Sequence, residues 1–232
     1  MNYTKGLRDG IPVGLGYLAV SFGFGITAVR AGLSVLQAAV ISATNLTSAG
    51  QAAGVTVIAE NGTLIEMALV QLVINIRYSL MALSLSQRLD SSFNTGHRLI
   101  AAYGITDEIF ALASMHPGRV APGYMYGLIT DGFIGWVAGT VLGAVAGDIL
   151  PPMISNALGI MIYGMFVALI IPPSKRAKNV LFTVATAAAL SIGLKLLFPA
   201  LSAGFGVIIA GAVSAGAAAL LFPVADDKEE KA

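Results

Sequence analysis

Residues 64–85 read LIEMALVQLVINIRYSLMALSL, an apolar run that carries an arginine, Arg77, past its middle. A helix that crosses the hydrocarbon core of a bilayer needs about 20 predominantly apolar residues. A charge near the centre of such a helix costs roughly 2.5–3.5 kcal/mol on insertion scales, so it faces a partner or a water-filled path. A second apolar run, LIAAYGITDEIFALASM at residues 99–115, carries Asp107 and Glu108. Buried charges of both signs predict a membrane protein that moves something across the bilayer.

The composition of the whole chain agrees with a membrane protein. Of its 232 residues, 56% are hydrophobic and 11% are charged, against about 25% charged in a soluble domain. The chain contains no cysteine, which excludes disulfides, thiolate metal sites and cysteine nucleophiles. A net charge of +1 gives no reason to expect a nucleic-acid partner. We predict an all-α integral membrane protein that needs no cofactor.

Eight apolar runs are candidates for membrane crossing, which predicts a polytopic bundle of about seven or eight transmembrane helices, some of them broken. The runs are Ile11–Val29, Leu36–Ala59, Leu64–Leu85, Leu99–Met115, Val120–Val145, Met153–Ile171, Val180–Phe198 and Phe205–Phe222. The number of crossings falls to seven if Leu99–Met115 is re-entrant or if the first two runs cross together.

The basic residues predict the orientation. With eight crossings and the N-terminus inside, the residues on the inner face are Lys5, Arg8, Arg119, Lys175, Arg176, Lys178, Lys228 and Lys231. Arg30, Arg88 and Arg98 fall outside. Because cytoplasmic loops carry an excess of Lys and Arg, this distribution predicts a cytoplasmic N-terminus.

The domain organisation is expected to be simple. We predict one transmembrane domain over residues 1–225 and a polar tail over 226–232. Gly16-Tyr-Leu lies 111 positions before Gly127-Leu-Ile, which suggests repeats over residues 8–117 and 119–223. Internal repeats are common in transporters. Short glycine-rich matches also arise by chance in apolar sequence, so both explanations stay open.

The second run contains a dense group of hydroxyl and amide side chains. Thr44, Ser48 and Gln51 would form one stripe on a continuous helix, and Asn45 lies beside them. Gly50 weakens the helix, and a break there would expose backbone N–H groups and carbonyls that can hold a substrate carboxylate and ammonium. Asn45, Ser48, Gly50 and Gln51 are therefore candidate substrate-binding residues. Ordinary interhelical packing by small polar residues is the alternative.

The buried charges define the other candidates. Arg77, with its neighbours Asn75 and Tyr78, could hold a substrate carboxylate. Alternatively, Arg77 forms a structural ion pair with Asp107, Glu108 or Asp131.

Adjacent helical residues point about 100° apart, so Asp107 and Glu108 need not share one partner. One of them could pair with Arg77 while the other exchanges protons, or both could lock helices together. Asp131 carries the same ambiguity. His97 and His116 make no metal site, and no catalytic motif is present.

The chain resembles the AzlC family, the large subunit of bacterial branched-chain amino acid exporters. The resemblance is carried by Gly10-Ile-Pro12…Phe22-Gly23-Phe24-Gly25, Ala31-Gly32-Leu33-Ser34, Ser48-Ala-Gly50-Gln51, Asn75-Ile-Arg77-Tyr78 and Thr106-Asp107-Glu108-Ile-Phe110-Ala111. It covers about the first half of the chain in motifs and the second half in hydropathy.

This resemblance implies export of leucine, isoleucine or valine across the bacterial plasma membrane, driven by the proton gradient. It also implies a small hydrophobic membrane subunit of the AzlD type. The residues alone leave a second reading open, an ion channel or ion transporter that uses the buried charges as a conduction path. A membrane enzyme is disfavoured, because the chain has no metal-ligand cluster and no Gly-x-Ser-x-Gly motif.

Overall fold

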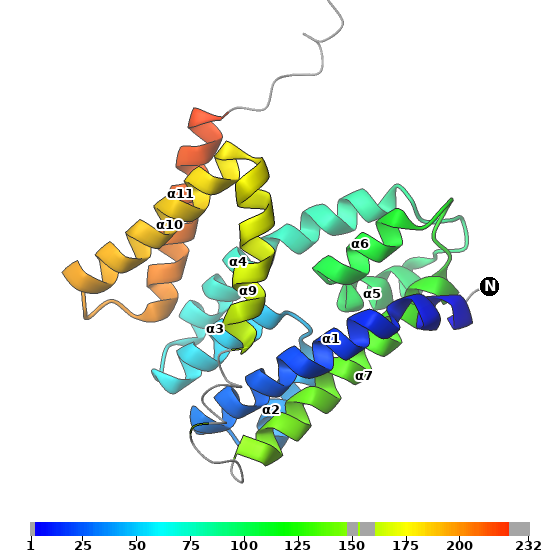
Figure 1. Cartoon of the computed structure of the whole chain (residues 1–232), viewed down its shortest axis with the longest axis horizontal. Coiled ribbons are helices and arrows are strands. Elements are labelled where there is room, and N and C mark those ends of the chain that lie inside the picture. Colours follow the sequence, from blue (N-terminus) through cyan, green and yellow to red (C-terminus); the bar gives the residue numbers. More distant parts are fainter. Residues whose placement is uncertain (1–2, 148–152, 154–160, 223–232) are drawn as a thin grey trace, which may run out of the picture. The chain divides into compact units, whose positions relative to one another are not determined.

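The computed structural model describes residues 3–147, 153 and 161–222, and its regular elements over these residues are helices (Figure 1). The helices are α1 (Tyr3–Arg30), α2 (Val35–Thr44), α3 (Ser48–Ala59), α4 (Leu64–Ser86), α5 (Thr95–Gly104), α6 (Asp107–Met115), α7 (Pro122–Gly147), α9 (Met161–Arg176), α10 (Lys178–Leu197) and α11 (Ala203–Leu221). Five of them, α1, α4, α7, α10 and α11, are long and apolar enough to cross a membrane. The prediction of an all-α polytopic membrane protein is confirmed.

Two predicted segments fall partly or wholly outside the described residues. The expected polar tail, 226–232, lies outside them. Of the expected span Met153–Ile171, the structure describes Met153 and the part from Met161 onward, where α9 begins.

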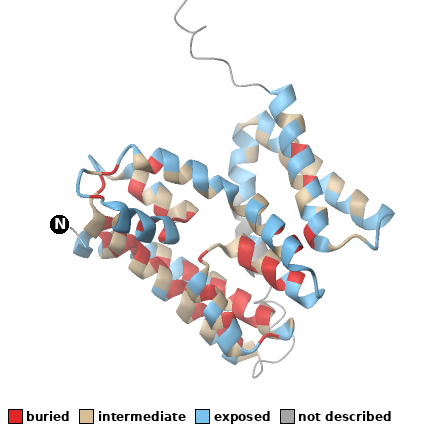
Figure 2. Ribbon diagram, turned by 180° about the vertical axis from the view of Figure 1, so that it is seen from behind, coloured by how far each residue is buried: buried red, intermediate tan, exposed pale blue. Residues whose placement is uncertain are grey.

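The chain packs into two compact units, and α3 and α4 contribute to both. The first unit comprises residues 1–55 and 74–163, and the second comprises 56–73 and 164–232. In the second unit, the buried side chain of Glu66 accepts a hydrogen bond from Ser202, the residue that caps α11. The helix α10 buries none of its residues (Figure 2).

The centre of the first unit is a parallel pair formed by α1 and α7, which carry much of the buried surface (Figure 2). Gly6 lies against Gly127, and Gly14 lies against Gly135, so both helices start at the same end. A Cβ atom on Gly135 would overlap the Gly14 carbonyl. Glycine lets membrane helices approach this closely, and in lipid such contact is a main source of helix association.

The predicted span Leu99–Met115 does not cross the membrane as one helix. It consists of α5 and α6, which meet at Ile105 and Thr106. At 1.5 Å per residue, each is about 14–15 Å long, half of the hydrocarbon thickness.

Hydrogen bonds show that the start of α5 and the end of α6 lie at the same end of the first unit. The loop before α5 is bonded to the loop after α6: the Asp90 amide donates to the Val120 carbonyl at 3.0 Å, and the Val120 amide donates to the Arg88 carbonyl at 2.8 Å. His97, in the first turn of α5, lies 2.5 Å from the Tyr126 hydroxyl of α7. The segment therefore forms a hairpin of two short helices, the shape expected of a re-entrant segment.

This hairpin corrects the expected positions of the basic residues. Arg88 and Arg98 lie at the same end of the first unit as Arg119 rather than on the opposite face. Lys5 lies at this end too, because its ammonium group is 5.1 Å from the centre of the Tyr124 ring at the start of α7. Hydropathy alone cannot distinguish a full crossing from two half-crossings, so the number of crossings stays a prediction.

The predicted span Leu36–Ala59 is interrupted as well, at Asn45–Thr47 rather than at Gly50. The Asn45 side-chain oxygen accepts hydrogen bonds from the Thr47 amide at 3.1 Å and from the Thr47 hydroxyl at 2.5 Å. Such local bonds compete with helix formation. Gly50 lies inside α3. The expected stripe of Thr44, Ser48 and Gln51 does not form, because the break separates Thr44 from the other two.

Residues 3–59 and 64–115 share one order of elements: a long helix, a capped short helix, a break and a second short helix. Ser34 caps α2, and Asn94 caps α5. The helix α4 ends at the end of the first unit where α1 begins. The two interrupted pairs therefore follow long helices of opposite direction. The repeats proposed over 8–117 and 119–223 stay a prediction.

Candidate functional site

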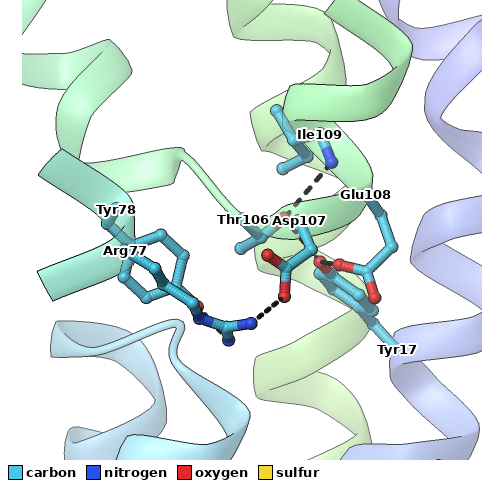
Figure 3. Close-up of polar contacts among 7 residues, drawn as sticks. All are labelled: Tyr17, Arg77, Tyr78, Thr106, Asp107, Glu108 and Ile109. Carbon is cyan, nitrogen blue, oxygen red and sulfur yellow. Dashed lines mark hydrogen bonds and ion pairs between the residues drawn. The ribbon is translucent and has the colours of Figure 1, made fainter. Parts of the chain in front are cut away.

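Arg77 and Asp107 form an ion pair in the first unit, with 2.7 Å between the arginine nitrogen and the carboxylate oxygen (Figure 3). Their side chains are 44% and 32% exposed. Tyr78 supports the guanidinium, which lies 5.1 Å from the centre of the tyrosine ring and 3.4 Å from its hydroxyl. Of the three carboxylates considered as partners of Arg77, the structure pairs it with Asp107.

Glu108 has a different partner, the hydroxyl of Tyr17 on α1. The two oxygens are 2.5 Å apart, and the Tyr17 hydroxyl is also 2.6 Å from the Thr106 hydroxyl (Figure 3). Thr106 caps α6 by accepting the Ile109 amide at 3.3 Å. Two carboxylates in the first turn of a helix interact favourably with its positive end. Among the described residues, Glu108 forms no ion pair.

A second polar network lies at the carboxyl end of α2. The indole N–H of Trp136 donates to the Gln51 side-chain oxygen at 2.8 Å. Because an indole nitrogen can only donate, this bond fixes which end of the amide is oxygen. The amide nitrogen then faces the carbonyls of Ile41 and Asn45 and the hydroxyl of Ser42. Gln51, Ser42 and Trp136 are buried.

Three further contacts connect this network to the rest of the first unit. The Ser42 hydroxyl lies 2.7 Å from the Thr140 hydroxyl of α7. The Tyr103 hydroxyl, at the end of α5, donates to the Ala43 carbonyl at 2.5 Å. Tyr17 and Trp136 also meet, with 5.3 Å between ring centres. The two breaks are therefore joined through α1 and α7 and through a direct contact.

The other predicted residues lie in or beside this region, with one exception. Ser48 begins α3, Gly50 is buried and directly precedes Gln51, and Asn75 is half-buried on α4. Asp131 does not join Arg77. It lies on α7 against Gly10 of α1, and one of its carboxylate oxygens is buried without a hydrogen-bond partner.

Sequence reasoning missed Tyr17, Ser42, Tyr103, Thr106 and Trp136. Two of these carried a signal. Thr106 followed by two acidic residues is a helix N-terminus pattern. Trp136 is the single tryptophan of the chain, and a buried indole needs an acceptor for its N–H. Tyr17 and Tyr103 sit in apolar stretches whose sequence gives no indication of a partner, and Ser42 opens the polar group of the second run without a partner being evident.

Chemically, the region offers a cation, two carboxylates with different partners, and a set of helix-end carbonyls. Among the described residues, no three His, Asp or Glu side chains lie close enough together to hold a metal ion. These groups could contact both positively and negatively charged partners.

Comparison with known proteins gives a consistent assignment. The AzlC protein family model matches residues 12–150, more than half of the chain. The inner membrane protein YgaZ of Escherichia coli is 29% identical over 196 residues, which cover 82% of this chain and 80% of that protein. An uncharacterized membrane protein of Archaeoglobus fulgidus is 29% identical over 175 residues, 75% of this chain and 76% of its own length.

A third relative, an uncharacterized membrane protein of Helicobacter pylori, is 25% identical over 185 residues, 76% of this chain and 79% of its own length. No solved structure matches the chain significantly. The match of the family model, over residues that include both interrupted pairs and both carboxylates of α6, shows that the chain is a membrane protein belonging to the AzlC family.

Proposed function

We propose that the chain is a secondary transporter that exports small neutral amino acids, with leucine, isoleucine and valine as its substrates. The observation that carries this proposal is the arrangement at the start of α6, where Asp107 pairs with Arg77 while the adjacent Glu108 bonds to an uncharged phenol. If both carboxylates served only to hold helices together, we would expect each of them to pair with a cation.

The two carboxylates then have separate roles. Asp107 balances Arg77 when no substrate is present, and Arg77 holds the carboxylate of the amino acid. Glu108 is the group that takes up and releases the coupling proton, because its partner Tyr17 can stay hydrogen-bonded to either form of the acid. Asn45, Ser48, Gly50, Gln51, Asn75 and Tyr78 line or support the substrate region in this proposal. Asp131 is a further proton-binding candidate.

The orientation and the partner belong to the same proposal. Lys5, Arg8, Arg88, Arg98 and Arg119 gather at the end of the first unit where α1 begins, and Arg30 lies at the other end. By the positive-inside rule, this supports a cytoplasmic N-terminus in the bacterial inner membrane. A small hydrophobic AzlD-type subunit completes the transporter, and the exposed apolar surface of α10 in the second unit is consistent with a partner or lipid there.

The test is efflux of labelled leucine from cells loaded with a leucine-containing peptide, measured with and without a small AzlD-type subunit. We expect saturable efflux that Arg77→Ala and Asp107→Asn each reduce at least tenfold, because each leaves its partner as an unpaired charge within the membrane. Arg98→Ala, which removes an exposed charge near the start of α5, serves as the control and should keep efflux near the original level.

Two results would contradict the proposal. One is the absence of efflux for every branched-chain amino acid, even with the small subunit and with the protein present in the membrane. The other is ion conductance that does not saturate with amino acid, which would favour the channel reading.

A further inference from the structure

A cavity of about 290 Å³ opens in the second unit, where the end of α10, the start of α11 and the turn after α3 meet. Small-molecule sites typically enclose roughly 300–1,000 Å³, so this cavity has the size of a site for a small ligand. All of its lining residues belong to the second unit, whereas Arg77, Asp107 and Glu108 belong to the first. The cavity is therefore separate from the candidate site described above.

The walls of the cavity combine apolar side chains with two opposite charges. The apolar surface comes from Leu194, Phe198, Leu201 and Val207, and the charges come from Glu60 and Lys195. Apolar walls with a small number of placed polar groups are typical of sites that bind small molecules. A ligand that fits this lining carries an apolar side chain and charged groups of both signs.

The two charges line one cavity without neutralising each other. Lys195, in the last turn of α10, and Glu60 form no ion pair, with each other or with any other described residue. Opposite charges that face one cavity without meeting can each bind the complementary group of a ligand between them. A lone anion or a lone cation would satisfy only one of the two, so the arrangement selects a zwitterion.

Contacts with α11 hold Glu60 at the cavity. Its carboxylate accepts the Ala203 amide at 3.1 Å through one oxygen, and its other oxygen has no hydrogen-bond partner among the described residues. The neighbouring Ser202 hydroxyl donates to the buried carboxylate of Glu66. A Cβ atom at Gly204 would overlap the same carboxylate, so α11 packs closely against α4 here. The carboxylate of Glu60 is therefore positioned before any ligand arrives.

We propose that this cavity is a second amino acid site, in which Lys195 binds the carboxylate, Glu60 binds the primary ammonium and the apolar wall contacts the side chain. The choice of leucine, isoleucine or valine as ligand rests on the proposed function, whereas the selection of a zwitterion rests on the two charges. The headgroup of phosphatidylethanolamine also combines a primary ammonium with an anionic group. The experiment therefore separates a free amino acid from this lipid.

The experiment is isothermal titration calorimetry of the purified chain in phosphatidylcholine nanodiscs. The protein carries Arg77→Ala, so that the proposed export site does not contribute. The ligands are L-leucine, 4-methylpentanoate (leucine without its amino group) and 3-methylbutylamine (leucine without its carboxyl group). We expect leucine to bind saturably and each analogue to bind at least tenfold more weakly, because each loses one hydrogen-bonded charge.

Substitutions at the two charges should affect the analogues in opposite ways. Lys195→Ala should weaken leucine and 4-methylpentanoate about tenfold and leave 3-methylbutylamine unchanged. Glu60→Gln, which keeps an acceptor for the Ala203 amide, should weaken leucine and 3-methylbutylamine and leave 4-methylpentanoate unchanged. Lys178→Ala removes an exposed lysine at the other end of α10 and is the matched control, with all three affinities unchanged.

The stoichiometry of the chain with Arg77 in place provides an independent measurement. We expect two leucines per chain, falling to one in Lys195→Ala at leucine concentrations that saturate the stronger site. A single leucine per chain whose binding is unaffected by Lys195→Ala and Glu60→Gln would overturn the second site.

Other outcomes would overturn the proposal for different reasons. Equal weakening of all three ligands by Lys195→Ala or Glu60→Gln would show that these residues act on the fold rather than on a ligand. Leucine binding that disappears when phosphatidylethanolamine is added to the nanodiscs would assign the cavity to the lipid. Leucine efflux without Lys195-dependent binding defeats this inference alone, whereas Lys195-dependent binding without any amino acid efflux defeats the export proposal alone.

Discussion

The break between α2 and α3 and the break between α5 and α6 both occur at short polar residues within apolar sequence, yet their polar side chains gather at different helix ends. At the first break, the neutral donors of Gln51 and Tyr103 occupy the carbonyls that end α2. At the second break, two carboxylates accompany the amides that begin α6.

The difference indicates a division of labour. A cluster of helix-end carbonyls attracts positive charge and has no titratable group of its own, whereas a pair of carboxylates beside one arginine can change its charge.

The largest expected effect concerns the side of the membrane on which the loops before α5 and after α6 lie. The chain has no natural cysteine, so single cysteines can be placed without background. We expect Ser91→Cys and Pro117→Cys to be labelled by a membrane-impermeant maleimide from one and the same side, because hydrogen bonds join their two loops. Arg30→Cys, at the other end of α1, should be labelled from the opposite side. Labelling of Ser91→Cys and Pro117→Cys from different sides would show that α5 and α6 cross the membrane.

The next effect concerns the helix pair on which both breaks rest. Gly135→Leu places a side chain where α7 touches the Gly14 backbone, so the protein should fail to accumulate in a folded, monodisperse form. Gly16→Leu is the control, because a Cβ atom at Gly16 meets no other group. Size-exclusion chromatography of detergent extracts measures both variants. Equal yields of the two would mean that α1 and α7 do not need their close contact.

A functional difference between the carboxylates should follow. Glu108→Gln keeps an acceptor for Tyr17 but cannot exchange a proton, so leucine counterflow should persist while efflux loses its response to an imposed proton gradient. Asp107→Asn should instead lower counterflow itself, because Arg77 loses its partner. Proteoliposomes with and without a pH gradient separate the two effects. A gradient response that survives in Glu108→Gln would transfer the coupling role to Asp107 or Asp131.

The smallest expected effect compares the two threonines at the breaks. The Thr106 hydroxyl both caps α6 and contacts Tyr17, whereas the Thr47 hydroxyl bonds only to Asn45 among the described residues. Thr106→Ala should therefore lower the free energy of unfolding in detergent by about 1–2 kcal/mol, the range of a lost helix cap. Thr47→Ala should cost about half as much, because the Thr47 amide keeps its bond to Asn45. The reverse order would show that the first break is the more demanding one.

The sequence predicted the long helices well because crossing a bilayer requires apolar length, and length is visible in the residues. The expected span Ile11–Val29 lies within α1, and Val120–Val145 overlaps most of α7. The breaks were harder to place. Gly50 was expected to interrupt the second run, but it lies inside α3. The hydrogen bond between Asn45 and Thr47 places the interruption before α3 instead.

The sequence identified the charged residues of this region, but not which of them form pairs. Arg77 and the two carboxylates of α6 were identifiable because charges are rare in apolar runs. Which of three carboxylates meets Arg77 depends on how α4 packs near the start of α6, and no pattern within either run contains that information. The re-entrant path of α5 and α6 likewise depends on bonds between Arg88, Asp90 and Val120, in loops that hydropathy treats as separate.

The glycine contact between α1 and α7 restricts how a transport cycle could proceed. The backbones that touch at Gly14 and Gly135 cannot slide or tilt relative to each other without losing that contact. The two helices would therefore behave as one rigid body. Opening to either side would then fall to α2, α3, α5 and α6, each only two or three turns long. In the proposed transporter, these short helices would then move relative to the rigid pair of α1 and α7.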